Sequence, residues 1–148
     1  MEWRREDGYT LSDDPALADL DTVHGWLSRE SYWARGIPRD VVARSLANSL
    51  CFTLLAPQDQ GGGQAGFCRA ITDRATFAYL ADVFVLDAHR GRGLGKWMVQ
   101  RVLEHPALQG LRRWLLATST AHGLYSRYGF EPVSNPAVFM EILRPYEP

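Results

Sequence analysis

The chain has 148 residues, 46% hydrophobic and 22% charged, so it is long enough to bury one core and predicts a single domain over residues 1–148. Its formal net charge of −1 gives no electrostatic reason to expect nucleic acid or an anionic membrane as a partner. No apolar run approaches the roughly 20 residues that cross a bilayer, and residues 1–7 lack the apolar stretch of a signal peptide, so we expect a cytoplasmic protein.

The first third of the chain predicts one short strand followed by two helices. Residues 9–12 favour a strand, which ends at a turn before Pro15. A helical pattern begins near Asp21, which we expect to be its N-cap. Pro38 suits the first turn of a second helix, predicted from Arg39 to Asn48.

The middle of the chain predicts three strands joined by turns, at residues 50–56, 64–72 and 76–86. Strands joined by tight turns pair in antiparallel fashion. A glycine-rich loop follows, and then a helix that ends near Glu104, before Pro106.

The last third predicts a strand from Arg113 to Thr118, a short helix from Ala121 to Tyr128, and two final strands, Phe130 to Val133 and Val138 to Leu143. A strand, helix and strand in succession across the glycine loop require a parallel pair, so the sheet is mixed. A loop at the carboxyl end of a central strand is a common place for a ligand site in open α/β sheets.

The glycine loop, Arg90-Gly91-Arg92-Gly93-Leu94-Gly95-Lys96, combines three alternate glycines with three cations. Glycines allow backbone N–H groups to approach a phosphate closely, and a helix start adds free donors and partial positive charge. Arg90, Arg92 and Lys96 add formal positive charge. The segment therefore predicts an anion site.

Two known nucleotide-binding motifs do not match this segment. In the dinucleotide fingerprint the third glycine position falls on Lys96. In the nucleoside triphosphate loop, Trp97 stands where a serine or threonine must hold magnesium, and Arg90 stands where the first glycine belongs.

The stretch Arg90–Gly95 resembles the (Gln/Arg)-x-x-Gly-x-(Gly/Ala) signature of GNAT-superfamily N-acetyltransferases, which bind the pyrophosphate of acetyl-CoA. Asp82–Val85 on the preceding strand fits the same family, and Ala121–Phe130 is similar to its Ala-x-x-Leu-Tyr-x-x-x-Gly-Phe element. The element order also resembles a GNAT domain over nearly the whole chain. The resemblance implies an α/β (α+β) fold with a mixed, mostly antiparallel central sheet, a splayed parallel strand pair and about four flanking helices.

The resemblance implies acetyl-CoA as co-substrate. In the family, the backbone of the central strand pairs with the pantetheine arm and the loop amides hold the pyrophosphate. The matching cofactor-binding residues are Val83, Val85, Arg90, Gly91, Arg92, Gly93, Gly95, Lys96 and Tyr125.

Acetyl transfer to an amine needs a proton for the leaving thiolate. An alkyl thiol has a pKa of about 8.5, so a tyrosine, at about 10, is a suitable weak acid. Tyr125 matches the family tyrosine that lies close to the CoA sulfur, and we assign it as general acid; the alternative is a core aromatic residue. Many family members carry asparagine seven residues earlier, where this chain has Thr118.

Asp82 is the second catalytic candidate, and it also belongs to the predicted acceptor site. A lone carboxylate in an apolar run is costly unless something pairs with it. Asp82 could accept the amine proton, directly or through water, or orient the ammonium; the alternative is a structural carboxylate that binds backbone or an arginine. His122 ranks below it as a base.

We expect the acceptor to be recognised by Tyr32, Trp33 and Arg35, between the first two helices. The aromatic residues favour an aromatic or small aliphatic amine, and Arg35 or Arg69 could hold a substrate carboxylate. Further candidates are Phe67, Arg69, Asp73 and Phe77.

The histidines and cysteines show no metal-ligand spacing, so we expect no metal, and we expect Cys51 and Cys68 to be buried thiols. The sequence thus predicts an acyltransferase that acetylates the amine of a small molecule by direct transfer. The alternatives are a non-catalytic acyl-CoA-binding or regulatory module and a protein N-acetyltransferase. A homodimer remains open because members of the family are often dimers.

Overall fold

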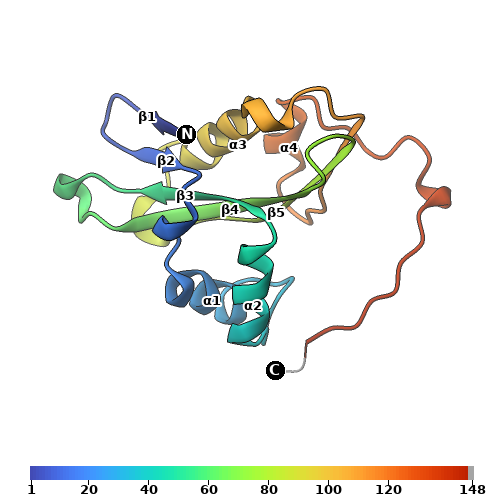
Figure 1. Ribbon diagram of the computed structural model, residues 1–148, viewed down its shortest axis with the longest axis horizontal. Helices are drawn as coiled ribbons and strands as arrows, with labels where there is room; N and C mark the ends of the chain where they lie inside the picture. Colours follow the sequence, from blue (N-terminus) through green and yellow to red (C-terminus); the bar gives the residue numbers. More distant parts are fainter. Residues whose placement is uncertain (147–148) are drawn as a thin grey trace.

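A six-stranded sheet between two helical layers forms the body of the computed structural model, which describes residues 1–146 (Figure 1). The strands are β1 (Glu2–Arg4), β2 (Thr10–Ser12), β3 (Leu50–Leu55), β4 (Gln64–Thr72), β5 (Phe77–Val85) and β6 (Arg113–Leu115). The helices are α1 (Leu20–Arg29), α2 (Arg39–Ala47), α3 (Leu94–Leu103) and α4 (His122–Ser126). None of the helices in these residues is long and apolar enough to cross a membrane.

The strands lie in sequence order across the sheet, and every neighbouring pair is antiparallel except β5 and β6, which are parallel. This confirms the mixed, mostly antiparallel sheet. Pairing between β5 and β6 covers only Phe77–Tyr79 against Arg113–Leu115. Because β5 continues to Val85 without a β6 partner, the parallel pair is splayed, as the resemblance implied.

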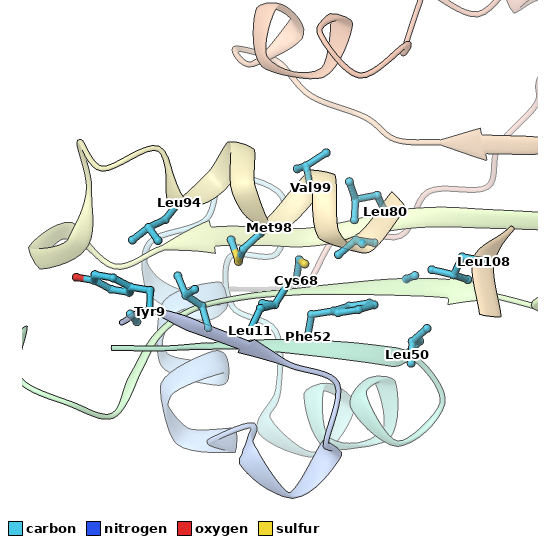
Figure 2. Packing of buried hydrophobic residues seen from close by; sticks show 14 of the residues in the cluster. Tyr9, Leu11, Leu50, Phe52, Cys68, Leu80, Leu94, Met98, Val99 and Leu108 are labelled. Atoms are coloured by element: carbon cyan, nitrogen blue, oxygen red, sulfur yellow. The ribbon is translucent and has the colours of Figure 1, made fainter. Parts of the chain in front are cut away.

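Alternation along the strands gives the sheet two apolar faces. Phe52 and Cys68 point toward α3 and pack with Met98, as Figure 2 shows. Their neighbours Cys51 and Phe67 belong to the cluster formed with α1 and α2 on the other face. Full burial of each large apolar side chain contributes about 1.5–3 kcal/mol, so these two layers hold the sheet and helices together. Both cysteines are free and buried, as predicted.

The start of α1 differs from the prediction. The N-cap is Asp19, whose carboxylate accepts a hydrogen bond from the backbone N–H of Asp21 at 3.1 Å. Asp21 instead lies in the first turn, where its charge favours the helix dipole. Helix α2 begins at Arg39 as expected, with Pro38 at the N-cap position and not in the first turn.

The two predicted final strands are absent from residues 130–146, and that prediction is wrong. The segment contains only a short 3-10 turn, Pro136–Val138, and it leads away from the sheet (Figure 1). Two prolines, Pro132 and Pro136, lack the N–H that a ladder needs. Apolar residues in this segment do not guarantee pairing: Met140 is 96% exposed.

Other predicted boundaries shift by a few residues. Strand β6 ends at Leu115 instead of Thr118, and α4 covers only His122–Ser126 of the predicted Ala121–Tyr128. Strand β1 was not predicted, because two of its three residues are charged and only Trp3 is apolar.

Candidate active site

A cavity of about 600 Å³ opens where β5 and β6 diverge. One wall is the part of β5 from Leu80 to Val85, and the opposite wall is the segment from Leu116 to Ala121. The other lining residues are Trp26, Tyr32, Trp33, Tyr79, Arg90, Gly95, Leu124 and Tyr125. The cavity therefore brings together residues from the central strand, the glycine loop, the first interhelical segment and α4.

The central strand is irregular where it lines the cavity. Asp82 has a φ of 55°, a left-handed conformation that aspartate tolerates better than most residues. The register between β4 and β5 shifts in the same region, between Phe67 and Arg69. Bulges of this kind bend a strand, and here the bend accompanies the loss of pairing with β6 beyond Tyr79.

Asp82 is held by two donors. Arg69 Nε donates to Asp82 Oδ2 at 2.6 Å, and Trp33 Nε1 donates to Asp82 Oδ1 at 2.9 Å. The side chain of Asp82 is only 7% exposed, and Arg69 also donates from Nη1 to Ser49 Oγ at 2.9 Å. The carboxylate is thus paired with an arginine, as the cost of a lone buried charge requires, while it still lines the cavity.

The glycine loop has the geometry of an open cradle. Gly91 and Gly93 have φ values of 81° and 72°, which only glycine adopts without strain, and Gly93 directly precedes α3. A Cβ added at Gly91, Gly93 or Gly95 would meet no atom within 4 Å. Gly95 has no positive φ, yet it lines the cavity from the first turn of α3. Open space therefore lies in front of the loop, and contacts within the protein do not explain Gly95.

The loop cations differ in their contacts. Arg90 donates from Nε to the Val85 carbonyl at 3.0 Å and pairs with Asp87 at 2.8 Å. Arg92 donates to Gln60 Oε1 at 3.0 Å, and Lys96 is exposed. The backbone of Val85 is predicted to pair with pantetheine, and its carbonyl here accepts a hydrogen bond from Arg90, a side chain that is 56% exposed. Val83 and Val85 are half-buried and line the cavity.

Tyr125 lies in α4 and is buried at the cavity wall, 9% exposed. Burial raises the pKa of Tyr125 to about 12, with smaller contributions from Cys68 and Tyr32, so the phenol keeps its proton. His122 does not line this cavity: it faces a second one, of about 550 Å³, between β6 and residues 130–134.

Besides Asp82, two of the predicted acceptor residues lie at the cavity. Tyr32 and Trp33 line it, and Tyr32 Oη accepts a hydrogen bond from the Ser119 backbone N–H at 3.0 Å. This contact joins the α1–α2 segment to the cavity wall that follows β6. Hydrogen bonding with Ser119 also lowers the pKa of Tyr32. Arg35 is exposed and is not part of the lining. The further candidates Phe67, Arg69, Asp73 and Phe77 are not part of it either.

Sequence reasoning missed Trp26 and Tyr79, which both line the cavity. Trp26 follows the helical apolar period of α1 and Tyr79 fits the alternation of β5, so neither stands out from residues that only pack. Thr118, which stands where many family members have asparagine, accepts from the Ala121 backbone N–H at 3.0 Å and so holds the start of α4. No cluster of three or more metal-ligating side chains occurs in residues 1–146.

Comparisons with known proteins agree on one family. The profile of the acetyltransferase (GNAT) domain matches residues 49–132. A Gibberella zeae protein named "putative acetyltransferase" is 38% identical over 145 aligned residues, covering 86% of this chain and 80% of that protein.

Solved structures show the same fold. A Xanthomonas campestris protein described as a "putative acetyltransferase belonging to the gnat family" is 49% identical, with a TM-score of 0.87 over 93% of this chain and 94% of that chain. A Clostridium acetobutylicum "predicted acetyltransferase with acetyl-CoA" is 15% identical, with a TM-score of 0.65 over 97% of this chain and 96% of that chain, and therefore shares the fold alone.

Proposed function

This chain belongs to the GNAT family of acetyltransferases, and from that membership we propose that it transfers the acetyl group of acetyl-CoA directly to the amine of a small molecule. Acetyl-CoA is the co-substrate expected of the family, and when bound it supplies the acetyl group as a thioester.

The observation that supports the proposal is that one cavity contains both ends of a transfer site. Arg90 and Gly95 lie at the loop end, Asp82 lies farther back along β5 in contact with Trp33, and Tyr125 lines the same space. Holding donor and acceptor in one such space turns a bimolecular encounter into an effectively unimolecular step.

Two parts of this cavity fit acetyl-CoA. The β5 edge beyond Tyr79 lacks a strand partner, so its backbone at Val83 and Val85 can pair with the two pantetheine amides. The amides of the loop and the start of α3 suit a pyrophosphate, with charge from Arg90, Arg92 and Lys96.

Tyr125 and Asp82 are the proposed catalytic residues. Tyr125 keeps its proton because its pKa is raised to about 12, and it donates that proton or a hydrogen bond to the leaving sulfur. Asp82 has used one lone pair on each oxygen, so both oxygens retain acceptor capacity for the N–H of the incoming amine. A strand N–H near Val83 polarises the thioester carbonyl.

The proposal is tested by two measurements on the same preparations. Titration calorimetry measures CoA affinity, and thiol release from acetyl-CoA with a broad amine panel measures transfer. The double substitution Arg90→Ala with Gly93→Asp should weaken CoA binding at least about tenfold, because it removes a charge and places a carboxylate in the cradle.

The matched control is Arg112→Ala with Gly110→Asp. Gly110 also has a positive φ, 76°, with open space around it, and Arg112 is exposed. The control should leave CoA affinity unchanged; equal losses in both variants would contradict the loop assignment. CoA binding without thiol release from any amine would instead identify an acyl-CoA-binding module.

A further inference from the structure

Three aromatic residues surround Asp82 in the cavity. Trp33 donates to Asp82, and Tyr32 and Tyr79 line the same space. Tyr32 packs edge-on against Trp33 with ring centroids 5.0 Å apart, and Trp33 lies 5.5 Å from Trp26. Trp26 in turn stacks on Phe84 at 4.4 Å with nearly parallel rings. Four rings therefore form one connected aromatic wall anchored in the core, and Tyr79 lines the same cavity from β5.

The polar tips of the two exposed aromatic residues are already engaged. The Trp33 N–H donates to Asp82, and the Tyr32 oxygen accepts from the Ser119 backbone. At Tyr32 and Trp33, an acceptor molecule therefore meets mainly ring surfaces. Ring surfaces favour flat apolar groups by area burial and by offset or edge-on stacking, which adds about 0.5–1.5 kcal/mol for an aromatic pair.

Charge at this end of the cavity is balanced. Asp82 and Arg90 are the two charged residues among those that line it in the described part of the chain. Arg90 belongs to the loop end, where it contacts Val85 and Asp87. Asp82 is compensated by Arg69 at 2.6 Å, and Arg69 is committed to Asp82 and Ser49.

This balance decides which amines the site accepts. A substrate carboxylate or phosphate would enter a partly buried site that offers it no free cation, which is costly. Neither residue predicted to hold such a group is placed to do so, since Arg35 lies outside the lining and Arg69 is paired. A second ammonium would likewise find no uncompensated anion.

From the aromatic wall and the balanced charge, we infer that the acceptor is a primary monoamine carried on an uncharged aromatic body, the arylalkylamine class. This inference rests on the proposed acetyltransferase function. The ring lies against Tyr32, Trp33 and Tyr79, and the amine nitrogen faces the free acceptor capacity of Asp82. Amino acids, phosphorylated amino sugars and polyamines are disfavoured.

A matched pair of amines tests the charge preference. 4-Methylbenzylamine and 4-(aminomethyl)benzoate share the ring and the aminomethyl group and differ in a methyl versus a carboxylate. In thiol-release assays with wild-type protein, kcat/KM should be at least about tenfold higher for the methyl compound, a discrimination typical of one unmatched polar group. Equal or reversed values would overturn the inference while leaving the acetyltransferase function intact.

A second comparison tests the ring surface. Tyr32 is 58% exposed, so its substitution leaves the core undisturbed. Tyr32→Leu should lower the ratio of kcat/KM for 4-methylbenzylamine over propylamine at least about threefold, whereas Tyr32→Phe, which keeps the ring, should preserve the ratio. CoA titrations confirm that both variants are folded. An unchanged ratio in Tyr32→Leu would overturn the inference. If wild-type protein binds CoA but acetylates no amine, the proposed function itself fails.

Discussion

At the scale of single residues, Tyr125 combines burial with access to the cavity. Tyr125→Phe removes the hydroxyl and keeps the ring, which packs edge-on against Phe130. We expect kcat to fall about 100-fold, the lower end of what a general acid contributes, while CoA affinity stays unchanged. The control is Tyr128→Phe, since Tyr128 packs on the core without lining the cavity. Equal kinetics in the two variants would contradict the role of Tyr125.

The raised pKa of Tyr125 also predicts the pH profile. A group with a pKa of about 12 stays protonated across the working range, so its loss of the proton cannot lower the rate at pH 7–10. With 4-methylbenzylamine as acceptor, the rate should rise with pH as the amine becomes neutral and should not fall up to pH 10. A fall in kcat below pH 10 in the wild type, absent in Tyr125→Phe, would contradict this prediction.

Asp82 is a residue whose structural and chemical roles can be separated. Asp82→Asn keeps the size and tolerates the positive φ, but it leaves the partly buried Arg69 without a charged partner. We expect the free energy of unfolding in urea to fall by about 3 kcal/mol, the lower end for breaking a buried ion pair. Adding Arg69→Met should restore part of that loss, because the unpaired charge is then gone.

The same two variants address the proposed role of Asp82 toward the amine. If Asp82 orients the acceptor, Arg69→Met with Asp82→Asn should regain stability but not kcat/KM. Recovery of both would show that Asp82 acts only by fixing the fold around it.

At the scale of elements, Gly95 in the first turn of α3 predicts two effects of opposite sign. Gly95→Ala should raise the free energy of unfolding by up to about 1 kcal/mol, because alanine favours a helix and open space surrounds the site. The same methyl group occupies the space proposed for the pyrophosphate, so CoA affinity should fall severalfold. Thermal melts and titration calorimetry measure the two effects.

Gly123 in α4 is the control for that prediction. It is also helical, lacks a positive φ and has nothing within 4 Å of an added Cβ. Gly123→Ala should stabilise the protein without changing CoA affinity. If Gly95→Ala behaves in the same way, the pyrophosphate does not lie against Gly95.

The elements that could be predicted from sequence are those whose signal is local. Strand β4 follows from the turn residues on either side of it, and α2 and α3 follow from proline and glycine just before them. The bulge at Asp82 and its partners could not be predicted, because Arg69 and Trp33 reach it from distant segments. The role of Trp26 could not be predicted either. Helical periodicity shows that its face of α1 is covered, but not whether the core or a cavity lies against it.

At the scale of the whole molecule, the two core clusters and the cavity lie within the part of the chain that ends at Phe130. The prediction of two final strands failed at this scale. Pairing depends on whether the sheet edge offers a partner strand as well as on the apolar residues of the segment itself. Residues 138–143 contain Val138, Met140 and Ile142, exposed at 65%, 96% and 80%. Their exposure means that little apolar area is buried there.

A chain that ends at Ser134 should therefore fold and bind CoA with unchanged affinity. The main interaction it loses is Arg113 over the Phe139 ring, 5.0 Å from the centroid, and such exposed contacts contribute about 0.5–1 kcal/mol. For a chain of this size that corresponds to a fall in Tm of at most about 4 °C. Phe139→Leu in the full chain removes the same contact and should produce the same shift. A much larger fall in the truncated chain alone would show that residues 135–146 pack against the body in solution.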